Sequence, residues 1–522
     1  MAQYDSPPRL DARPSTDPPR GSLHKRLTQN SISNVSRHIL MLGVAFFLTP
    51  FIVRSVGDAS YGLWVVMLSF VGYAGILELG VQPAVVKLVG QYRGSGELGK
   101  LEELLSAAFV FFMTIGSLVA VFIAFLLPPL APNLVKEVPG LDGLGLLFVF
   151  VGIDALILFL NYLFAGILFG AQLYHTKNIV DLTILVLYAA LLVLFLPSGG
   201  LVVLAGAKVA TDLLALIVTI IDGRRAMPDL HMGLSRLTAD SFKELLSFGG
   251  RVFVVAITSR AATHSMPLII SSQLTAAATA FFAIPVRLVD YSRQISWALT
   301  MGFMPMFSEL GGKKDHVAIR ALYLRYSRYL LFLNLPILVL TFVHGVEFIA
   351  IWIGPDYAEQ GGAALYLLTA AAMARGFQPL LWRLFIGLGH LDLMVVVSAS
   401  TSLLGIVLAF FFVKPYGLAG AALAILVTTT IAQVVFVWHT SRYFELSVFG
   451  LLKEIHLRPF VVAGLYYGVA LACARWLGQE SYARIGLAAL VSLCAYLPMA
   501  FVSLSLSERR GAMGFVRGKL AR

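Results

Sequence analysis

Fourteen apolar segments, each long enough for a helix to cross a lipid bilayer, follow one another through most of this chain. They begin near residues 33, 61, 103, 144, 178, 201, 246, 276, 326, 362, 391, 416, 459 and 483. A membrane-spanning helix needs about 20 mostly apolar residues, whereas the strands of a membrane barrel are shorter and alternate in polarity, which these segments do not. With 58% hydrophobic and only 13% charged residues, the chain is also more apolar than soluble domains are. We therefore predict an all-α polytopic membrane protein with about 14 transmembrane helices.

The basic residues divide unequally between the two sides of such a protein. If the loops alternate and the N-terminus lies inside, 26 Lys and Arg residues fall on the cytoplasmic side and five on the other. Lys and Arg in short loops stay on the cytoplasmic side of a membrane, so we expect both termini in the cytoplasm. The formal net charge of +11 then reports topology and does not imply a nucleic-acid partner.

An internal repeat with an offset of 217 residues relates the two halves of the chain. Three separated blocks match at this offset: 50–55 with 267–272, 163–170 with 380–387, and Gly200-Leu201 with Gly417-Leu418. Long apolar sequences resemble one another by chance, but three blocks that share one offset favour a duplication. Six spans fit into 217 residues, and because six is even, both halves enter the membrane in the same direction. We predict two six-helix bundles related by a pseudo-two-fold axis along the membrane normal, followed by two C-terminal helices.

The predicted spans divide the chain into five parts. These are a proline-rich, disordered cytoplasmic tail at residues 1–27, an N-terminal six-helix lobe at 28–225, a C-terminal six-helix lobe at 242–442, accessory helices 13 and 14 at 458–506, and a basic cytoplasmic tail at 507–522.

Several spans of the second half contain ionisable residues. An arginine at bilayer depth costs roughly 2.5–3.5 kcal/mol on insertion scales, so several of them imply a water-filled cavity or charged partners. The seventh segment carries Arg260 and His264, four residues apart on one helix face. The eighth carries Asp290 between Arg287 and Arg293, so that one local ion pair leaves one positive charge over.

The tenth segment adds Arg375 and Gln378 to these groups. Guanidinium groups bind phosphate oxygens through two parallel hydrogen bonds and stay charged, so a cavity with surplus arginine suits an anion. The alternative is that carboxylates on neighbouring helices neutralise the arginines. We predict a cationic substrate-binding cavity lined by Arg260, His264, Arg287, Arg293, Arg375 and Gln378; the carboxylates of the alternative are Glu78, Asp154, Asp212 and Asp290.

Carboxylates within the spans are also candidates for ion coupling. We select Glu78, Asp290, and Asp154, which shares a helix face with Asn161. The simpler role for each is a structural ion pair. Lys208 and Asp212, four residues apart, are expected to form such a pair.

The sequence offers little for catalysis. The outer loops are short, and neither a phosphate-binding glycine loop nor a two-histidine metal motif is present. We therefore expect no enzyme, no cofactor and no metal site. Cys473 and Cys494 fall within the last two segments and are expected to pack against neighbours and not to form a disulfide. Transport is favoured over chemistry.

Short motifs, most of them near the ends of the first two segments, resemble those of a known superfamily. They are Asn30-Ser31-Ile32-Ser33-Asn34, Pro50 to Arg54, Gly57, Tyr61-Gly62-Leu63-Trp64 and Glu78-Leu79-Gly80. With them the chain resembles the polysaccharide transporter branch of the multidrug/oligosaccharidyl-lipid/polysaccharide (MOP) flippase superfamily, which includes Wzx-type O-antigen and exopolysaccharide repeat-unit flippases.

The resemblance implies a multi-pass protein of the bacterial inner (plasma) membrane. Such a protein moves an undecaprenyl-pyrophosphate-linked oligosaccharide from the cytoplasmic to the periplasmic leaflet by alternating access. Its partners would be this lipid-linked oligosaccharide, membrane lipids and the polysaccharide polymerase machinery. The chain departs from the family pattern at His264, where an acidic residue is common, and at Phe281-Phe282, where Gly-Tyr is usual. The resemblance therefore does not carry over a coupling ion.

Two other classes compete with a flippase. A multidrug/cation antiporter of the related multidrug extrusion family would be expected to have an acidic cavity. From a different class, the chain could be a membrane glycan polymerase, which would be expected to place its catalytic groups in a larger external loop, or a non-transporting scaffold.

Overall fold

The chain folds into packed α-helices throughout the part that the computed structural model describes. These are residues 40–134, 145–228, 230–300, 302–376, 378–389, 392–504 and 508–509, except for the side chains of residues 133–134, 234, 248–260 and 262. Every regular element in this part is a helix, so the prediction of an all-α protein is confirmed. Eight of the helices are long and apolar enough to cross a membrane by length and composition. The number of fourteen spans and the bounds of the five parts stay predictions, and residues 1–27 lie outside the described residues.

The first half begins with the helix Leu40–Val56, which precedes α2. It continues with α2 (Asp58–Ala74), η1 (Gly75–Glu78), α3 (Val81–Ser95), α4 (Leu98–Val121) with its extension η2 (Phe122–Leu126), η3 (Pro128–Leu130), α5 (Ala131–Leu134), α6 (Gly145–Gly170) and α7 (Tyr174–Ala226). The chain leaves the line of α2 after Glu78, because Leu79 and Gly80 take left-handed backbone angles with φ of 53° and 73°.

The second half repeats this order and adds two helices. After η5 (Leu234–Arg236) it contains α8 (Ala239–Gln273), α9 (Ala276–Thr300), α10 (Phe303–Gly312), α11 (His316–Trp352), α12 (Pro355–Arg375), α13 (Gln378–Leu388) and α14 (Asp392–Tyr443), then α15 (Val448–Leu452), η6 (Lys453–Leu457), α16 (Arg458–Leu477) and α17 (Tyr482–Ser503).

Side chains cap several of these helices. Thr238 accepts a hydrogen bond from the Ser241 amide at 3.2 Å, and Asp315 accepts one from the Ala318 amide at 2.9 Å, which satisfies amides that have no partner within the helix.

The two longest helices, α7 and α14, are each interrupted at a glycine. Gly200 has φ 55° and ψ −142°, and Gly417 has φ 59° and ψ −140°, a conformation that is almost restricted to glycine. A Cβ added at Gly420 would lie 2.1 Å from the carbonyl oxygen of Phe412, so the chain folds back on itself around Gly417. The two glycines are 217 residues apart, and so are the last residues of the two helices. The predicted duplication is confirmed by these matching positions.

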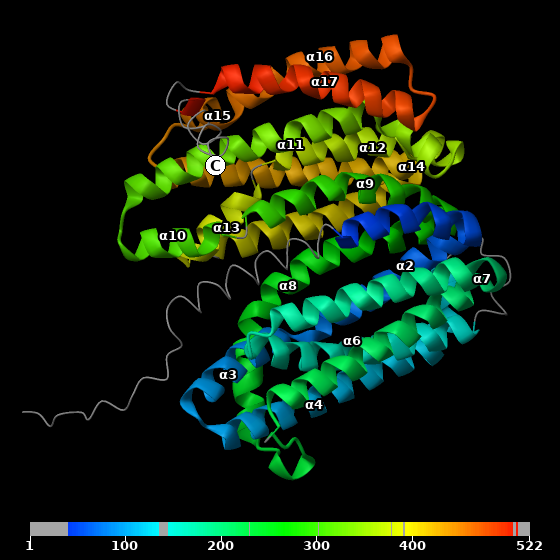
Figure 1. The fold of residues 1–522 in the computed structure, drawn as a ribbon, viewed down its shortest axis with the longest axis vertical. Helices are drawn as coiled ribbons and strands as arrows, with labels where there is room; N and C mark the ends of the chain where they lie inside the picture. Colours follow the sequence, from blue (N-terminus) through cyan, green and yellow to red (C-terminus); the bar gives the residue numbers. More distant parts are fainter. Residues whose placement is uncertain are drawn as a thin grey trace, which may run out of the picture.

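The helices form two groups, which Figure 1 shows one above the other. In the first group α6 packs against α3, α4 and α7; in the second, α12 packs against α11 and α14, and α16 packs against α11 and α17. Helix α8 joins the groups, because Glu244 near its beginning accepts hydrogen bonds from Tyr92 of α3, whereas Gln273 at its end donates to the Phe410 carbonyl of α14 at 2.8 Å. Cys473 and Cys494 are both free thiols, but only Cys473 is half-buried, so the expectation that both pack against neighbours is wrong for the exposed Cys494.

Candidate functional site

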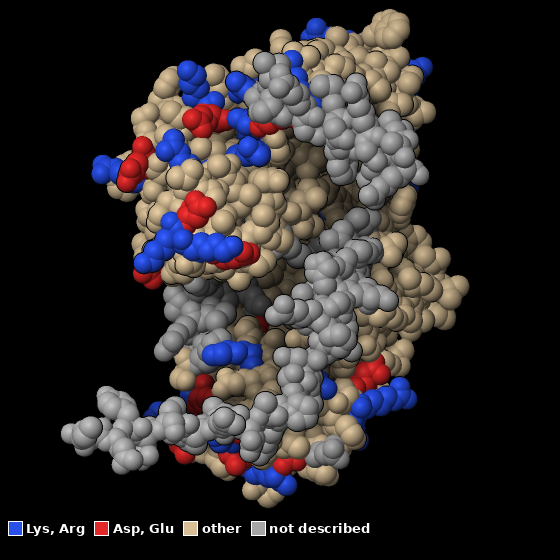
Figure 2. All heavy atoms as spheres, turned by 60° about the vertical axis from the view of Figure 1, so that its left-hand side comes forward, with Lys and Arg blue, Asp and Glu red and all other residues tan. Residues whose placement is uncertain are grey.

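A cavity of about 1080 Å³ lies between the two groups of helices. Its walls come from the helix Leu40–Val56 and from α2, α8, α9, α11, α12, α13 and α14. Figure 2, in which the left-hand side of Figure 1 comes forward, shows that the molecule is hollowed between the groups on this side. The volume is at the upper end of the range for small-molecule sites, so the cavity has room for a large ligand.

The opposite end of the cavity is closed by polar contacts between the two halves. The Arg54 guanidinium donates to three consecutive carbonyl oxygens at the end of α11, the nearest being that of Trp352 at 3.1 Å. The Tyr357 hydroxyl donates to the Asp58 carboxylate at 2.8 Å. We call these contacts of Arg54, Asp58, Trp352 and Tyr357 the polar seal.

Apolar packing reinforces the polar seal. The rings of Phe46 and Trp352 stack with centroids 4.8 Å apart. Helix α2 also approaches the start of α9 closely, because a Cβ added at Gly62 would lie 1.7 Å from the Ala276 carbonyl oxygen. The described residues therefore close this end of the cavity, and we call the side that is hollowed in Figure 2 its open side.

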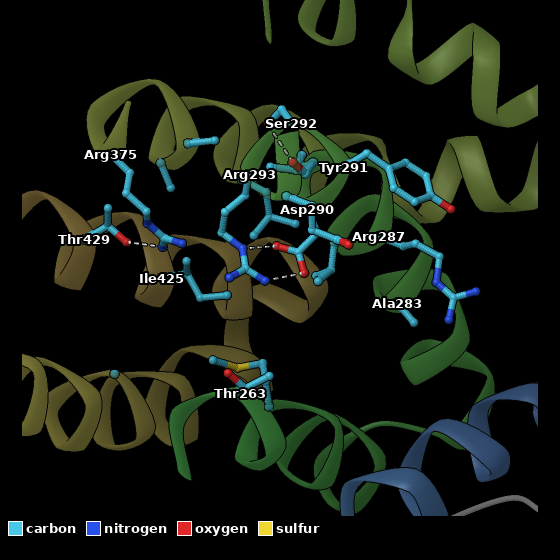
Figure 3. A pocket seen from close by; sticks show the side chains of 18 of the residues that line it. Thr263, Ala283, Arg287, Asp290, Tyr291, Ser292, Arg293, Arg375, Ile425 and Thr429 are labelled. Atoms are coloured by element: carbon cyan, nitrogen blue, oxygen red, sulfur yellow. Dashed lines mark hydrogen bonds and ion pairs between the residues drawn. The ribbon is translucent and has the colours of Figure 1, made fainter. Parts of the chain in front are cut away.

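Three arginines and one aspartate line the cavity, as Figure 3 shows. Arg293 pairs with Asp290 through two contacts, Nε to Oδ1 at 2.9 Å and Nη2 to Oδ2 at 3.2 Å. Arg375 extends from α12 toward the same region and donates to the Thr429 hydroxyl of α14 at 3.0 Å. Arg287 donates to the Thr49 hydroxyl of the first half at 2.5 Å.

The positive charges of this cluster exceed the negative ones. Among the described residues neither Arg287 nor Arg375 has a carboxylate within 4 Å, and Asp290 is the one acidic residue that lines the cavity. One-to-one neutralisation by carboxylates, the alternative considered from the sequence, therefore does not describe this cluster. Guanidinium groups that are held only by hydroxyls keep their charge available to a ligand.

The other predicted site residues lie as follows. His264 lines the cavity from α8, with its ring centroid 6.0 Å from that of Tyr73, and Gln378 lines it from the start of α13. The side chain of Arg260 lies outside the described residues. The structure therefore brings five of the six predicted residues, His264, Arg287, Arg293, Arg375 and Gln378, to one cavity.

Two of the candidate coupling carboxylates do not line the cavity. Glu78 is buried in η1. Asp154 is buried in the first group, where its Oδ2 lies 3.2 Å from Nζ of Lys208; the same Nζ lies 2.5 Å from Asp212. The expected ion pair of Lys208 and Asp212 is confirmed, and Lys208 also forms an ion pair with Asp154. Asp290 is the candidate that reaches the cavity.

Several polar and aromatic lining residues were not predicted. They include Ser296, Trp297, Asn334, Trp382, Thr429 and Gln433. A signal exists for one of them, because Gln433 is an amide in an otherwise apolar stretch, and polar residues within membrane spans commonly face the interior. Tryptophan and threonine fit lipid-facing and interior positions equally well, and their spacing does not separate the two.

A family model described as "Polysaccharide biosynthesis protein" matches residues 51–360, more than half of the chain. The chain belongs to this family. Two relatives match this chain over most of its length. A protein of Shigella flexneri described as "Putative O-antigen transporter" is 21% identical over 80% of this chain and 98% of its own length. The uncharacterized membrane protein EpsK of Bacillus subtilis (strain 168) is 22% identical over 93% of this chain and 97% of its own length.

Solved structures show that the chain shares its fold with known transporters. The lipid II flippase MurJ in an inward closed conformation superposes with a TM-score of 0.72 at 15% identity, covering 91% of this chain and 98% of that chain. An inward-facing multidrug resistance MATE family transporter of the MOP superfamily gives a TM-score of 0.65 at 14% identity, covering 81% and 99%. The predicted resemblance is therefore confirmed at the level of the family and of the fold, and the described helices that are long and apolar enough to cross a membrane make this a multi-pass membrane protein.

Proposed function

We propose that this protein is a flippase for an undecaprenyl-pyrophosphate-linked oligosaccharide repeat unit in the bacterial inner membrane. It would serve the synthesis of O-antigen, capsule or exopolysaccharide and work by alternating access. The observation that carries this proposal is the cavity of about 1080 Å³ lined by three arginines and one aspartate. Such a site has both the volume for a sugar headgroup and the charge for a diphosphate.

In this proposal the arginines hold the diphosphate. Arg293 and Arg375 reach the same region from α9 and α12 (Figure 3), so one diphosphate could bridge them. Arg287 adds charge near the first half, and Arg260, His264 and Gln378 complete the proposed site. Glu78, Asp154 and Asp290 stay candidates for ion coupling.

The proposed orientation follows from the distribution of basic residues. With the Lys- and Arg-rich loops in the cytoplasm, the polar seal faces the periplasm and the open side faces the cytoplasm. The described conformation would then be the one that admits a substrate made in the cytoplasm. The relative described as a putative O-antigen transporter and the structurally similar lipid II flippase support a lipid-linked substrate.

A multidrug/cation antiporter is the second candidate. A cation site requires uncompensated carboxylates, but within the described residues the cavity is lined by one, Asp290, which is paired with Arg293. The charge of the cavity therefore favours an anionic substrate.

A complementation experiment tests the flippase. In a strain that lacks the gene, the variant with both Arg293→Ala and Arg375→Ala should abolish glycan export and leave lipid-linked repeat units on the cytoplasmic side, with normal protein in the membrane. The matched control changes Arg224 and Arg225 to alanine, because these two exposed arginines end α7 outside the cavity. Normal export by the cavity double variant would overturn the proposal. Lipid-linked units that accumulate on the periplasmic side would indicate a polymerase instead.

A further inference from the structure

A second layer of side chains lines the cavity one helix turn beyond the arginines. On α9, Trp297 follows Arg293 by four residues, and on α14, Gln433 follows Thr429, the partner of Arg375, also by four. Residues four apart lie on the same helix face, so both face the cavity below the arginine layer.

This second layer lies on the side away from the polar seal. Helices α9 and α12 start together at the seal, where the rings of Phe281 and Tyr357 are 4.8 Å apart. The fold-back of α14 is also at this end, because Phe410 accepts a hydrogen bond from Gln273 at the end of α8. Helices α9 and α12 and the part of α14 after Gly417 therefore run from the seal toward the open side, and their later residues lie nearer to it.

Gln433 is a buried amide without a hydrogen-bond partner. Its side chain lines the cavity and the residue is 6% exposed, yet neither Oε1 nor Nε2 has a partner among the described residues. Buried polar groups are nearly always paired, and an orphan amide lowers stability. On the facing wall, by contrast, the Asn334 amide is satisfied, since it accepts from Ser296 at 2.7 Å and donates to the Leu330 carbonyl at 3.0 Å. The donor and the acceptor of Gln433 are therefore unused, and a rotation of its side chain can present both to a ligand in the cavity.

Trp297 presents an aromatic ring that is held in place from one side. The Arg383 guanidinium carbon lies 4.7 Å from the centroid of this ring, a cation–π contact that fixes the indole. Trp382, the neighbour of Arg383, also lines the cavity. The layer therefore combines two indoles with an unpaired amide, and such a site suits a ligand that has both apolar ring faces and hydroxyl groups.

We propose that Trp297, Trp382 and Gln433 form a saccharide-binding subsite for the sugar attached directly to the diphosphate, an inference that rests on the proposed function. A pyranose ring would stack on an indole with its C–H face, and the Gln433 amide would donate to one hydroxyl and accept from its neighbour. A sugar next to the diphosphate occupies the next turn of the cavity when the diphosphate lies between Arg293 and Arg375. This layer then selects the first sugar, whereas the arginines bind any polyprenyl diphosphate.

The test compares two classes of probe on the purified full-length protein. One probe is farnesyl diphosphate; the others are farnesyl diphosphates that carry one N-acetylhexosamine or one hexose. The wild type should bind at least one sugar-bearing probe more tightly than farnesyl diphosphate. Trp297→Leu and Gln433→Met should each weaken binding of that probe about tenfold and leave the affinity for farnesyl diphosphate unchanged.

Two features separate this role from a structural one. Gln433→Met removes an orphan amide while it keeps the volume, so its melting temperature should equal or exceed that of the wild type although its sugar affinity falls. Trp438→Leu is the matched control, because Trp438 also stacks with an arginine, Arg442 at 5.1 Å, but lies outside the cavity lining and is 51% exposed. This control should bind all probes as the wild type does.

The outcomes distinguish the two proposals. If the wild type binds no farnesyl diphosphate probe, the flippase proposal fails and the subsite fails with it. If it binds the probes but no sugar increases affinity, or if Trp297→Leu and Gln433→Met bind them as tightly as the wild type, the subsite alone is refuted. An equal loss for sugar-bearing and sugar-free probes would also refute it.

Discussion

The Arg293 guanidinium forms a two-point ion pair with Asp290, the carboxylate three residues before it on α9, at 2.9 and 3.2 Å. Their side chains are 43% and 39% exposed to the cavity. Ion pairs with this much exposure are worth about 0.2–1 kcal/mol, less than a charge-assisted contact with a diphosphate. Asp290 therefore occupies the phosphate-binding edge of Arg293 and can be displaced by a substrate.

Removing the carboxylate should strengthen anion binding. In Asp290→Asn the cavity gains one unit of positive charge and Arg293 no longer has an anionic partner, so we expect farnesyl diphosphate to bind about three- to tenfold more tightly. Calorimetry at low salt measures this change, and Glu347→Gln, a carboxylate outside the cavity lining, serves as control. Unchanged or weaker binding by Asp290→Asn would show that the pair does not compete with the ligand.

The polar seal should control access to the cavity from the side it closes. Ser69 lines the cavity, so a single cysteine there, in a background with Cys473 and Cys494 replaced by alanine, reports on this access. We expect Arg54→Gln and Tyr357→Phe to increase labelling by a membrane-impermeant thiol reagent added on the sealed side, because each removes a contact between the two halves.

A nearby arginine outside the seal supplies the control for this experiment. Arg484 lies at the start of α17 and pairs with Glu480, and both are exposed. Arg484→Gln should leave the labelling rate unchanged. Equal labelling of all three variants and the parent would exclude the seal as a barrier.

Gly200 and Gly417, which interrupt α7 and α14, should be sensitive to the addition of a side chain. A Cβ at Gly200 or Gly417 would meet nothing within 4 Å, so any loss of stability must come from the backbone conformation. We expect Gly200→Ala and Gly417→Ala each to destabilise the protein by about 1–3 kcal/mol, measured as thermal unfolding in detergent. Gly464 also has open space around it but is helical within α16, so Gly464→Ala should be neutral or slightly stabilising.

The fold could be predicted from the sequence at positions where the backbone conformation requires a particular type of residue. Gly200 and Gly417 match in the 217-residue repeat because both take the same left-handed conformation. Lys208 and Asp212 were predicted to pair from their spacing alone. The third member, Asp154, lies 54 residues from Lys208 on another helix, and no local rule gives the rotation of one helix against the other.

In the candidate site, the predictable residues were those whose charge makes insertion into a membrane span unfavourable, whereas the uncharged polar and aromatic residues were not predictable. Arg287, Arg293 and Arg375 stand out because a charge in a membrane span requires an explanation. Tyr357 and Asp58, which close the cavity, sit at helix ends where polar residues are ordinary. Their contact depends on how the two halves meet, and this arrangement differs between conformations of a transporter.

The Tyr92 hydroxyl of α3, outside the candidate membrane spans, donates to the Glu244 carboxylate of α8. The stability that this contact contributes should depend on pH. Burial, together with the adjacent Glu244 carboxylate, raises the pKa of Tyr92 to about 12. In the unfolded chain a tyrosine has a pKa of about 10, so the stabilising contact is fully present below pH 10 and is lost as the pH approaches 12. The wild type should therefore melt above Tyr92→Phe by a constant margin up to pH 10, and this margin should shrink at higher pH. A margin that stays constant to pH 12 would contradict the assignment.

Lys208 is the one cation that the structure places between Asp154 and Asp212, among the described residues. The Asp154 side chain is 5% exposed, whereas that of Asp212 is 32% exposed, so the two carboxylates depend on the lysine to different degrees. An unpaired charge is costly when it is buried and is solvated when it is not.

Lys208→Met should therefore destabilise the protein by about 3–5 kcal/mol, because it leaves the buried Asp154 carboxylate without a counter-charge. Adding Asp154→Asn to this variant removes the uncompensated charge and should restore much of the loss, whereas adding Asp212→Asn should restore less. Asp212→Asn alone should cost under about 1 kcal/mol, since Lys208 keeps its contact with Asp154. With the single variant Asp154→Asn added, thermal unfolding of these variants and the wild type closes two cycles, which measure the coupling of Lys208 to Asp154 and to Asp212. Equal rescue by the two asparagine substitutions would show that Asp154 is hydrated and that the ion pair does not hold α6 against α7.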